Sequence, residues 1–404
     1  MQVFNVKNNV YYIGVSDRGL RVFDIMMETK HGTTYNSYLI KEEGGVTIID
    51  GVKAGFTDKW LDNIRSLVDI KDIKYLVVQH TEPDHSGAIP ALLALNPNIE
   101  VYGSFMAMAN LKEINNAPFI SNVIKPKQEL KLSERQSLFF YPVPNVHWPD
   151  TIITHDPVNA IAFTCDFLGQ HIAPQQLLYS KEPNKKIIEE EIKLYYDAIM
   201  APFKSDVLKS VATLKSLDVS MVLNSHGYIL DTKEAVDWAI NNYIKWSTVN
   251  KSEKLTVTVV FASAYGYTRS MSEAVISELE KASALVHVFE VPRDDLATIV
   301  ARIEESDALL VASPTFVGDG IKPVYDVLNS LNPVMCFGKY FSAFGSYGWS
   351  GEAVHNYMNR ASELRFKKVD EGFKVRLKPS EKELEDTRLY ARNFIMKIKA
   401  ELNK

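Results

Sequence analysis

The sequence contains little cysteine and no long apolar run. Cys165 and Cys336 are the only cysteines in 404 residues and lie far apart, so no disulfide framework is indicated and a reducing compartment is favoured. No stretch reaches the ~18 consecutive apolar residues that a membrane-spanning helix needs. The N-terminal segment MQVFNVKNNVYYIGV lacks the basic region, apolar core and cleavage site of a signal peptide. We therefore expect a soluble cytoplasmic protein that has no membrane partner.

The chain also lacks a large excess of charge of either sign. Its formal net charge is -5, which is too small to indicate nucleic acid or an anionic membrane as a general partner. Low-complexity tracts and internal repeats are absent as well. Hydrophobic residues make up 46% of the chain, which is sufficient for packed cores, and the length exceeds that of one typical domain. The composition therefore predicts a globular protein of two domains.

Metal-ligating side chains are concentrated in residues 80–85, HTEPDH. The apolar run before them at 73–78, IKYLVV, is typical of a buried strand. The sequence Thr-Glu-Pro-Asp marks the turn that ends this strand, and a helical pattern begins at Ser86. Four potential ligands thus occupy one strand-to-helix turn, which is a higher density than a polar helix cap needs.

The spacing of these four residues predicts how they are divided between metal positions. Alternate side chains of an extended chain point the same way, so His80, Glu82 and Asp84 are expected to face one point. His85 then faces a neighbouring point, and a pair of metal ions fits this arrangement better than a single ion. The alternative is a solvated polar turn in which Asp84 caps the following helix.

Short strands and helices surround this segment. Strands are expected at 10–15, 36–40, 46–50, 99–102, 138–143, 160–165 and 219–223, and helices at 57–67, 105–114, 186–200, 205–217 and 233–246. Elements in this order predict two sheets packed between helices. The polar stretch at 248–254 predicts a linker, so that the first domain spans residues 1–250.

Beyond the linker, the pattern changes to a strict alternation of strand and helix. Strands are expected at 255–261, 284–290, 308–311 and 341–346, and helices at 268–281, 296–305, 324–331, 352–364 and 381–402. This alternation predicts a doubly wound parallel sheet at residues 254–404. A ligand of such a sheet binds beside the carboxyl ends of the strands.

Three loops at those strand ends are candidates for one ligand. The first combines hydroxyls, a glycine and a helix N-terminus, which together suit a phosphate: Ser263, Ala264, Tyr265, Gly266, Tyr267 and Thr268. The other two combine glycines with aromatic rings: Pro314, Thr315, Phe316 and Gly318, and Ser346, Tyr347, Gly348 and Trp349. A Gly-x-Gly-x-x-Gly motif and a Walker-type lysine are absent, so a dinucleotide or a nucleoside triphosphate is disfavoured.

The three loops resemble those of flavodoxins over residues 256–404. In that family the first loop binds the phosphate of FMN and the other two flank its isoalloxazine ring. The resemblance therefore implies FMN as a cofactor. Without it, three ordinary turns between strands and helices remain an alternative.

Three further candidate ligands stand at strand ends in the first domain. His147 follows the strand at 138–143, Asp166 follows the strand at 160–165, and His226 follows the strand at 219–223. Each is more often a surface or satisfied residue than a ligand when it occurs alone. Together with residues 80–85 they supply four histidines and three carboxylates, which suit two divalent ions bridged by Asp166.

The candidate ligands occur in motifs that resemble those of flavodiiron proteins. These are His-x-Glu-x-Asp-His at 80–85, His-Trp-Pro-Asp at 147–150, Asp166, and Ser-His-Gly at 225–227. This resemblance covers essentially the whole chain. It implies a metallo-β-lactamase-like αββα sandwich followed by the flavodoxin-like domain, with two irons per chain. The implied ligands are His80, Glu82 and His147 for one iron, Asp84, His85 and His226 for the other, and Asp166 for the bridge.

Glu82 is the position that separates this family from its hydrolytic relatives. Hydrolases of the wider superfamily usually carry histidine there and typically bind zinc. A carboxylate adds negative charge and favours iron that cycles between two oxidation states. The resemblance implies reduction of O2 to water or of NO to N2O, for which two ferrous ions and reduced FMN together supply up to four electrons.

The resemblance also implies partners. A head-to-tail homodimer, or a dimer of such dimers, would place the FMN of one subunit beside the irons of the other. The sequence has no Cys-x-x-Cys pair, so we expect no fused rubredoxin. The electrons are expected from a separate donor, such as rubredoxin, a reduced flavin or deazaflavin, or an NADH-linked reductase.

Some positions depart from the family pattern or stay open. Many members have a histidine near the metals where this chain has Asp24 and Ile25. His171 matches a histidine near the metals in relatives, and Tyr195 is a candidate for the substrate pocket. Two other functions remain as alternatives: a metallo-hydrolase with an accessory flavodoxin module, and an electron carrier that uses only its flavin. An iron assay separates all three.

Overall fold

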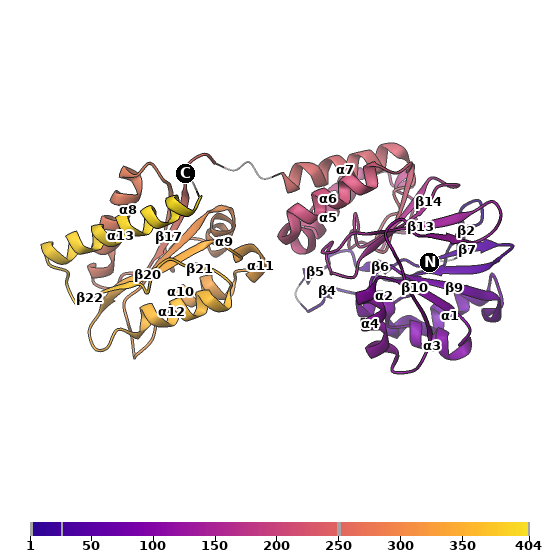
Figure 1. Cartoon of the computed structure of the whole chain (residues 1–404), viewed down its shortest axis with the longest axis horizontal. Coiled ribbons are helices and arrows are strands. Elements are labelled where there is room, and N and C mark those ends of the chain that lie inside the picture. Colours follow the sequence, from indigo (N-terminus) through magenta and orange to yellow (C-terminus); the bar gives the residue numbers. More distant parts are fainter. Residues whose placement is uncertain (1–2, 26, 249–251, 403–404) are drawn as a thin grey trace. The chain divides into compact units, whose positions relative to one another are not determined.

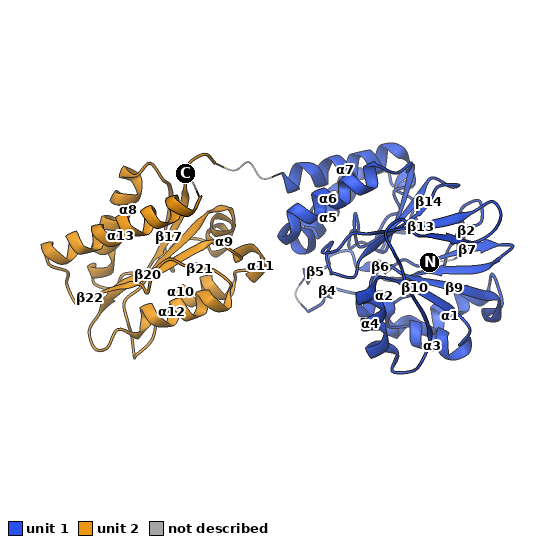
Figure 2. Ribbon diagram, viewed as in Figure 1, with its two compact units in different colours: residues 1–249 blue, residues 250–404 orange. Residues whose placement is uncertain are grey.

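The computed structural model describes residues 3–25, 27–248 and 252–402. The chain divides into two compact units, residues 1–249 and residues 250–404 (Figure 2). The expected linker at 248–254 lies partly outside the described residues, which exclude 249–251. Within the described ranges, no helix is both long enough and apolar enough to cross a membrane.

Unit 1 is built on two β-sheets (Figure 1). The larger sheet has the order β1 (Phe4–Lys7), β2 (Val10–Tyr12), β7 (Tyr38–Glu42), β8 (Gly45–Ile49), β9 (Ile73–Val78), β10 (Glu100–Gly103) and β11 (Ile120–Val123). The smaller sheet has the order β12 (Glu129–Lys131), β13 (Ser137–Pro142), β14 (Ile152–Asp156), β15 (Ile161–Cys165) and β16 (Met221–Asn224). Strands β8 to β11 run parallel, and so do β15 and β16.

Two short strand pairs and four 3₁₀ turns are further elements among the described residues of this unit. The pairs are β3 (Val15–Asp17) with β6 (Thr33–Tyr35), and β4 (Val22–Phe23) with β5 (Met27–Glu28). The turns precede helices or strands and lie at Ala54–Phe56, Ile70–Asp72, Tyr179–Lys181 and Ala201–Phe203. The β4–β5 pair carries Asp24 and Ile25 at its turn.

Helices cover the outer face of each sheet in unit 1. Those beside the larger sheet are α1 (Thr57–Arg65), α3 (Ile89–Leu95) and α4 (Phe105–Asn115), and those beside the smaller sheet are α5 (Lys185–Tyr195), α6 (Lys204–Lys215) and α7 (Lys233–Ser247). A third core lies between the sheets, where Ile49 and Val77 of one sheet pack with Phe163 and Leu223 of the other. The predicted αββα sandwich is confirmed.

Unit 2 is a single parallel sheet between two layers of helices. Its strand order is β18 (Leu285–Glu290), β17 (Thr256–Phe261), β19 (Ala308–Ala312), β20 (Tyr340–Tyr347) and β21 (Lys367–Lys368), with β22 (Phe373–Arg376) also paired to β20. One face packs on α8 (Tyr267–Lys281) and α13 (Glu381–Leu402), and the other on α9 (Leu296–Glu305), α10 (Lys322–Asn329) and α12 (Glu352–Glu363). A short helix, α11 (Pro333–Cys336), precedes β20. The predicted doubly wound parallel sheet is confirmed.

The sequence pattern missed strand β14 in the centre of the smaller sheet. All five of its residues are buried although His155 and Asp156 are polar. His155 Nε2 lies 3.0 Å from the carbonyl oxygen of Asp218, and Gln136 Nε2 donates to Asp156 over 2.6 Å. A hydrophobic pattern does not reveal such a strand, because long-range hydrogen bonds satisfy its polar side chains. The expected helix at 186–200 is also modified, since α5 passes into a π-helical turn at Tyr196–Met200.

The core between the two sheets predicts the effect of truncating a central ring. Phe163 is fully buried there, with its ring centroid 5.6 Å from that of Tyr38. Phe163→Ala is expected to lower the free energy of unfolding by about 3–5 kcal/mol, because apolar contacts are lost and a cavity remains. Phe105→Ala is the control, since Phe105 is 71% exposed in the same unit, and a change within about 0.5 kcal/mol is expected. Urea unfolding of both variants after removal of metal checks this, and equal stabilities would contradict it.

Candidate metal centre and ligand cavity

The loops at one end of the two sheets of unit 1 bring the seven predicted metal ligands together. His80 and Glu82 follow β9, and the one-turn helix α2 (Pro83–Ser86) carries the next two ligands. The remaining three come from loops after β13, β15 and β16. All seven are buried or nearly so, and their ligand atoms form two groups: His80, Glu82, His147 and Asp166, and Asp84, His85 and His226.

The first group converges on one oxygen of Asp166. Glu82 Oε2 lies 3.1 Å from His80 Nε2 and 3.1 Å from His147 Nε2. Asp166 Oδ2 lies 3.5 Å from His80 Nε2 and 3.2 Å from His147 Nε2. Two imidazole nitrogens and two carboxylate oxygens thus face a common point, which is a suitable donor set for one transition-metal ion.

The second group converges on the other oxygen of Asp166. Asp166 Oδ1 lies 2.9 Å from His85 Nε2 and 3.2 Å from His226 Nε2. Asp84 lies 3.4 Å from His85 Nε2 through Oδ1 and 3.1 Å from His226 Nε2 through Oδ2. One carboxylate therefore faces both groups, each through a different oxygen.

The expectation that Asp84 faces the same point as His80 and Glu82 is wrong. It assumed an extended chain through residue 84, whereas the helix α2 begins at Pro83. In a helix, successive side chains are about 100° apart and do not alternate. Asp84 and His85 consequently turn away from Glu82 and join His226.

The electrostatics of the centre fit a bound cation. The Asp84 carboxylate is buried, and its two oxygens face the imidazole nitrogens of His85 and His226 at 3.4 and 3.1 Å. Burial alone would disfavour charge on His226, but hydrogen bonds with Asp166 and Asp84 outweigh it and raise the pKa of His226 to about 10. Burial alone would likewise raise the pKa of Asp166, but the neighbouring His85, His147 and His226 hold it well below its usual value. The field of the carboxylates thus favours positive charge at the point where metal ions would sit.

Cys165 is buried next to the centre. Its sulfur lies in a further group with His85 and Asp166. Burial and the nearby carboxylates of Asp50 and Asp166 raise the pKa of this thiol well above its usual value. Since a thiol must ionise to bind a metal well, the raised pKa favours Cys165 as a small buried residue over a metal ligand.

His171 and Tyr195 lie beside the second group. Their ring centroids are 4.9 Å apart, and the ring of His171 is 4.9 Å from that of His226. His171 Nε2 and the Tyr195 hydroxyl are buried and have no hydrogen-bond partner within the described part of the chain. Burial lowers the pKa of His171 well below its usual value, so the imidazole is neutral. These two polar atoms are available to a small molecule near the metals.

The turn of the β4–β5 pair brings the carboxyl group of Asp24 to Glu82 of the first group. Ile25 points to solvent and is 95% exposed. Asp24 interacts with Glu82: partial burial, a hydrogen bond with Glu82 and the charges of Glu82 and Asp84 raise the pKa of Asp24 to about 7. A protonated Asp24 can donate a hydrogen bond to Glu82, which an imidazole can also do.

Sequence reasoning missed two partners of the histidines. Asp150 is fully buried and lies 2.9 Å from His80 Nδ1 through Oδ1, and the backbone oxygen of Thr34 lies 2.6 Å from His226 Nδ1. Burial raises the pKa of Asp150, but hydrogen bonds with His80 and Thr81 outweigh it and hold the pKa below its usual value. The aspartate of the His-Trp-Pro-Asp motif was a signal for the first partner. No sequence signal marks a backbone oxygen.

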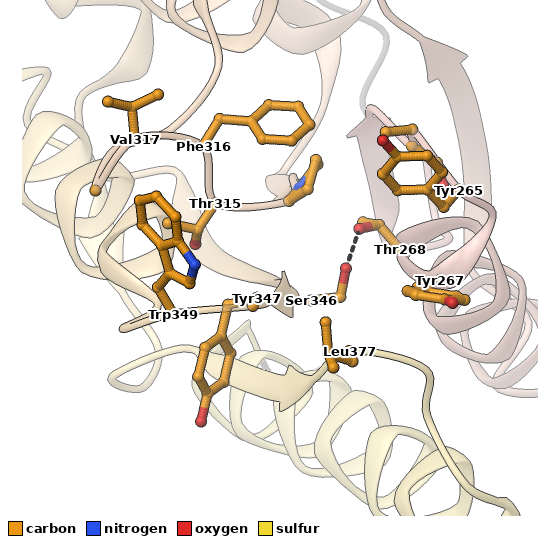
Figure 3. Close-up of a pocket in the computed structure, with 15 residues that line it drawn as sticks. Tyr265, Tyr267, Thr268, Thr315, Phe316, Val317, Ser346, Tyr347, Trp349 and Leu377 are labelled. Atoms are coloured by element: carbon orange, nitrogen blue, oxygen red, sulfur yellow. Dashed lines mark hydrogen bonds between the residues drawn. The ribbon is translucent and has the colours of Figure 1, made fainter.

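Unit 2 contains a cavity of about 320 Å³ at the carboxyl ends of its strands, within the usual range of about 300–1,000 Å³ for ligand pockets. All of the predicted loop residues except Gly266 line it, and Val317 and Leu377 were not predicted. Figure 3 shows Trp349 and Tyr265 on opposite sides of the cavity, with the hydroxyls of Thr268 and Ser346 between them. The two aromatic side chains are 84% and 81% exposed, so a flat ring entering the cavity would cover apolar surface.

The loop between β17 and α8 is shaped for an anion. Gly266, at φ +84°, adopts a left-handed conformation that glycine accepts without strain, and α8 begins at the next residue. The hydroxyl of Ser263 accepts hydrogen bonds from the backbone N–H groups of Gly266 and Arg269, over 3.1 and 3.2 Å. The hydroxyls of Thr268 and Ser346 are 2.9 Å apart. Hydroxyls and free N–H groups at a helix N-terminus are suitable donors to a phosphate.

Known protein families match the two units separately. The model described as ODP family beta lactamase matches residues 33–227, and the flavodoxin model matches residues 259–389. Both ranges include the site residues of their unit, so the FMN cofactor implied by the flavodoxin-like loops is supported by the family as well as by the cavity.

Relatives extend over the whole chain. Flavo-diiron protein FprA2 of Clostridium acetobutylicum is 33% identical over 401 residues, covering 98% of this chain and 100% of that protein. Anaerobic nitric oxide reductase flavorubredoxin of Escherichia coli is 30% identical, covering 96% of this chain and 81% of the relative. The solved structure of rubredoxin oxygen:oxidoreductase from Desulfovibrio gigas aligns with a TM-score of 0.69 at 25% identity over 100% of both chains. This chain belongs to the flavodiiron protein family.

Proposed function

We propose that this protein is an oxidoreductase that reduces O2 to water, NO to N2O, or both, at a di-iron centre supplied with electrons through FMN. The observation that carries the proposal is the position of Asp166, whose two oxygens face two separate groups of metal-ligating side chains. The names of the relatives support both substrates, since one is a nitric oxide reductase and another an oxygen oxidoreductase. We assign the di-iron centre to residues 1–250 and the FMN site to residues 254–404.

The two groups divide the proposed ligands between two irons. The first iron would be held by His80, Glu82 and His147, the second by Asp84, His85 and His226, and Asp166 would bridge them. Four imidazoles and three carboxylates form a mixed nitrogen and oxygen set that suits iron in either oxidation state. The irons and the reduced flavin supply the electrons, up to four in all, that reduction of O2 to water requires.

The protein positions these groups and controls access to them. Burial of the ligands excludes bulk water from the centre, which strengthens the interaction of the carboxylates with cations. His171 and Tyr195 would line the substrate position beside the second group, because their unpartnered polar atoms are buried there. A tyrosine hydroxyl and a neutral imidazole can each hydrogen-bond a diatomic ligand, and the hydroxyl can also deliver a proton.

The FMN would occupy the cavity of unit 2. Its phosphate would bind at residues 263–268, and its ring would lie between the loop of Pro314, Thr315, Phe316 and Gly318 and the loop of Ser346, Tyr347, Gly348 and Trp349. The exposed ring of Trp349 would then stack on the flavin, which buries apolar surface at the mouth of the cavity.

The reaction needs partners outside this chain. We propose a separate electron donor, either rubredoxin, as the name of the Desulfovibrio relative supports, or a reduced flavin or deazaflavin or an NADH-linked reductase. The metal centre and the FMN cavity belong to different compact units. A head-to-tail homodimer, or a dimer of such dimers, would place one subunit's flavin beside the other subunit's irons. We further propose that the protein works in the cytoplasm.

The bridging role of Asp166 gives the direct test of the proposed function. The wild-type protein is expected to contain about two irons per chain and to consume O2 or NO when its FMN is reduced. Asp166→Ala is expected to lose at least about half of the iron and nearly all activity, because both half-sites lose a ligand. Its FMN content should be unchanged, since the flavin site lies in the other unit. Iron analysis, flavin absorbance and substrate consumption check this, and an active variant with full iron would refute the bridging assignment.

Glu82 is expected to determine the preference for iron. Glu82→His replaces a hard anionic oxygen by a neutral nitrogen and makes the first group resemble that of the zinc hydrolases. We expect a higher zinc-to-iron ratio after expression in medium containing both metals, together with loss of turnover. Metal analysis by mass spectrometry provides the measurement. If the variant kept wild-type iron content and activity, Glu82 would have no part in metal selection.

The head-to-tail arrangement predicts complementation between two inactive variants. His147→Ala lacks a metal ligand, and Ser263→Ala combined with Thr268→Val removes hydroxyls from the phosphate loop. One interface of a mixed dimer would still pair an intact flavin with intact irons, so about half of the wild-type activity per dimer is the upper limit. Each variant alone should stay inactive. Co-expression with two affinity tags and mass analysis isolates the mixed dimer, and its inactivity would favour electron transfer within one chain.

A further inference from the structure

The histidines of the two groups differ in the partners of their second ring nitrogen. Each uses Nε2 toward the centre, which leaves Nδ1 for another partner. Asp150 Oδ1 lies 2.9 Å from His80 Nδ1. An ionised carboxylate only accepts hydrogen bonds, so His80 carries its proton on Nδ1 and directs a lone pair from Nε2 toward the metal position.

A short network behind His80 holds Asp150 in place. The second carboxylate oxygen, Oδ2, accepts from the backbone N–H of Thr81 over 2.8 Å and from the Thr81 hydroxyl over 2.5 Å. That hydroxyl in turn accepts from Asn110 Nδ2 over 2.9 Å. Asp150, at 0% exposed, therefore makes three hydrogen bonds to the His80–Thr81 segment. It connects the loop before β14 to the turn that carries the first ligands.

In the described part of the chain, no carboxylate is hydrogen-bonded to the second ring nitrogen of His85 or His226, although the buried Asp50 carboxylate interacts electrostatically with His85. His226 Nδ1 lies 2.6 Å from the backbone oxygen of Thr34 and 3.3 Å from the hydroxyl of Thr33, both of which are neutral. His85 Nδ1 is buried and has no hydrogen-bond partner among the described residues. The two half-sites share Asp166, and they differ in whether a carboxylate is hydrogen-bonded to the second nitrogen of an imidazole.

We propose that Asp150 is a positioning residue that makes the half-site of His80, Glu82 and His147 the tighter of the two iron sites. The inference rests on the proposed di-iron function. A carboxylate that accepts the Nδ1–H bond polarises the imidazole and increases electron density at Nε2, which strengthens the bond to a cation. It also fixes the ring orientation, so less freedom is lost when the metal binds. The neutral backbone oxygen of Thr34 polarises the His226 ring less than a carboxylate would. Within the described ranges, His85 has no hydrogen-bond partner at Nδ1 that could polarise its ring in this way.

The test is iron retention by the full-length holoprotein against a competing chelator. The wild-type protein is expected to release its two irons in two classes of different affinity. Asp150→Asn keeps the size of the side chain and removes its charge, and it should weaken the tighter class by about 10- to 100-fold while the weaker class changes little. The reduced protein enriched in ⁵⁷Fe gives an independent readout. One of its two Mössbauer doublets should shift in Asp150→Asn, and the other should stay in place.

Asp156→Asn is the matched control for loss of a buried carboxylate. Asp156 is also 0% exposed, lies at the opposite end of β14, and accepts hydrogen bonds from Gln136 and Asn159 over 2.6 and 2.7 Å. Its removal is expected to lower stability without changing either class of iron or either doublet. Weakening of both classes to the same extent in Asp150→Asn and Asp156→Asn would assign a purely structural role to Asp150 and overturn the proposal.

Thr81→Val is a second variant for the case that Asp150→Asn does not fold. It keeps the carboxylate and removes only the hydroxyl that donates to it, so the tighter class should weaken less than in Asp150→Asn but in the same direction. Unchanged retention and an unchanged spectrum in both variants that fold would overturn the role of Asp150 while leaving the di-iron function intact. A wild-type protein without two irons would instead refute the proposed function and the inference together.

Discussion

The carboxylate of Asp166 is shared by two groups of side chains, and the geometry of the metal centre depends on this sharing. One oxygen faces His85 and His226 within 3.2 Å, and the other lies 3.2 Å from His147. A buried carboxylate is unfavourable unless positive charge or hydrogen-bond donors surround it. The imidazoles meet this need in part, and two metal ions would meet it fully. In the proposed di-iron centre, the same residue would hold both ions.

The sandwich of unit 1 makes this meeting of side chains possible. Strands β9 of the larger sheet and β15 and β16 of the smaller sheet lead into loops that carry ligands, and a further ligand comes from the loop after β13, which β14 separates from β15. Burial between the sheets anchors the strands: Val77, Phe163 and Leu223 pack in one core. Ligands at the ends of well-packed strands are held in fixed positions, which a metal centre requires. The one-turn helix α2 then separates the ligands of its segment between the two groups.

The proposed metal centre and the proposed FMN site lie in different units. Unit 1 contributes charged and polar groups that are buried and densely hydrogen-bonded, whereas the cavity of unit 2 is lined by aromatic rings and a few hydroxyls. These environments suit their proposed ligands, because metal ions need anionic oxygens and neutral imidazoles, whereas a flavin needs a flat apolar slot and donors for one phosphate. The loop around Gly266 supplies those donors at the start of α8.

Much of the fold and most candidate site residues were predictable from the sequence. The apolar run at 73–78 matches β9, and α13 was predicted at residues 381–402, because periodic burial leaves a direct record in sequence. The loops that line the cavity of unit 2 were predictable for a related reason, since ligands of alternating α/β domains bind at strand ends. Strand β14 escaped, because the polar His155 and Asp156 are buried through partners distant in the chain.

The sequence by itself determined which residue types are present for metal and flavin chemistry and at which strand ends they stand. Tertiary structure decided which of these residues lie together in each group. Asp84 joins His226 and not Glu82, because α2 turns the backbone at Pro83. Asp150 reaches His80 across a separation of 70 residues, and the oxygen behind His226 belongs to the backbone of Thr34, 192 residues away. Spacing along a chain specifies side-chain direction only within one regular element, so contacts between loops of different strands are defined only when the sheets pack together.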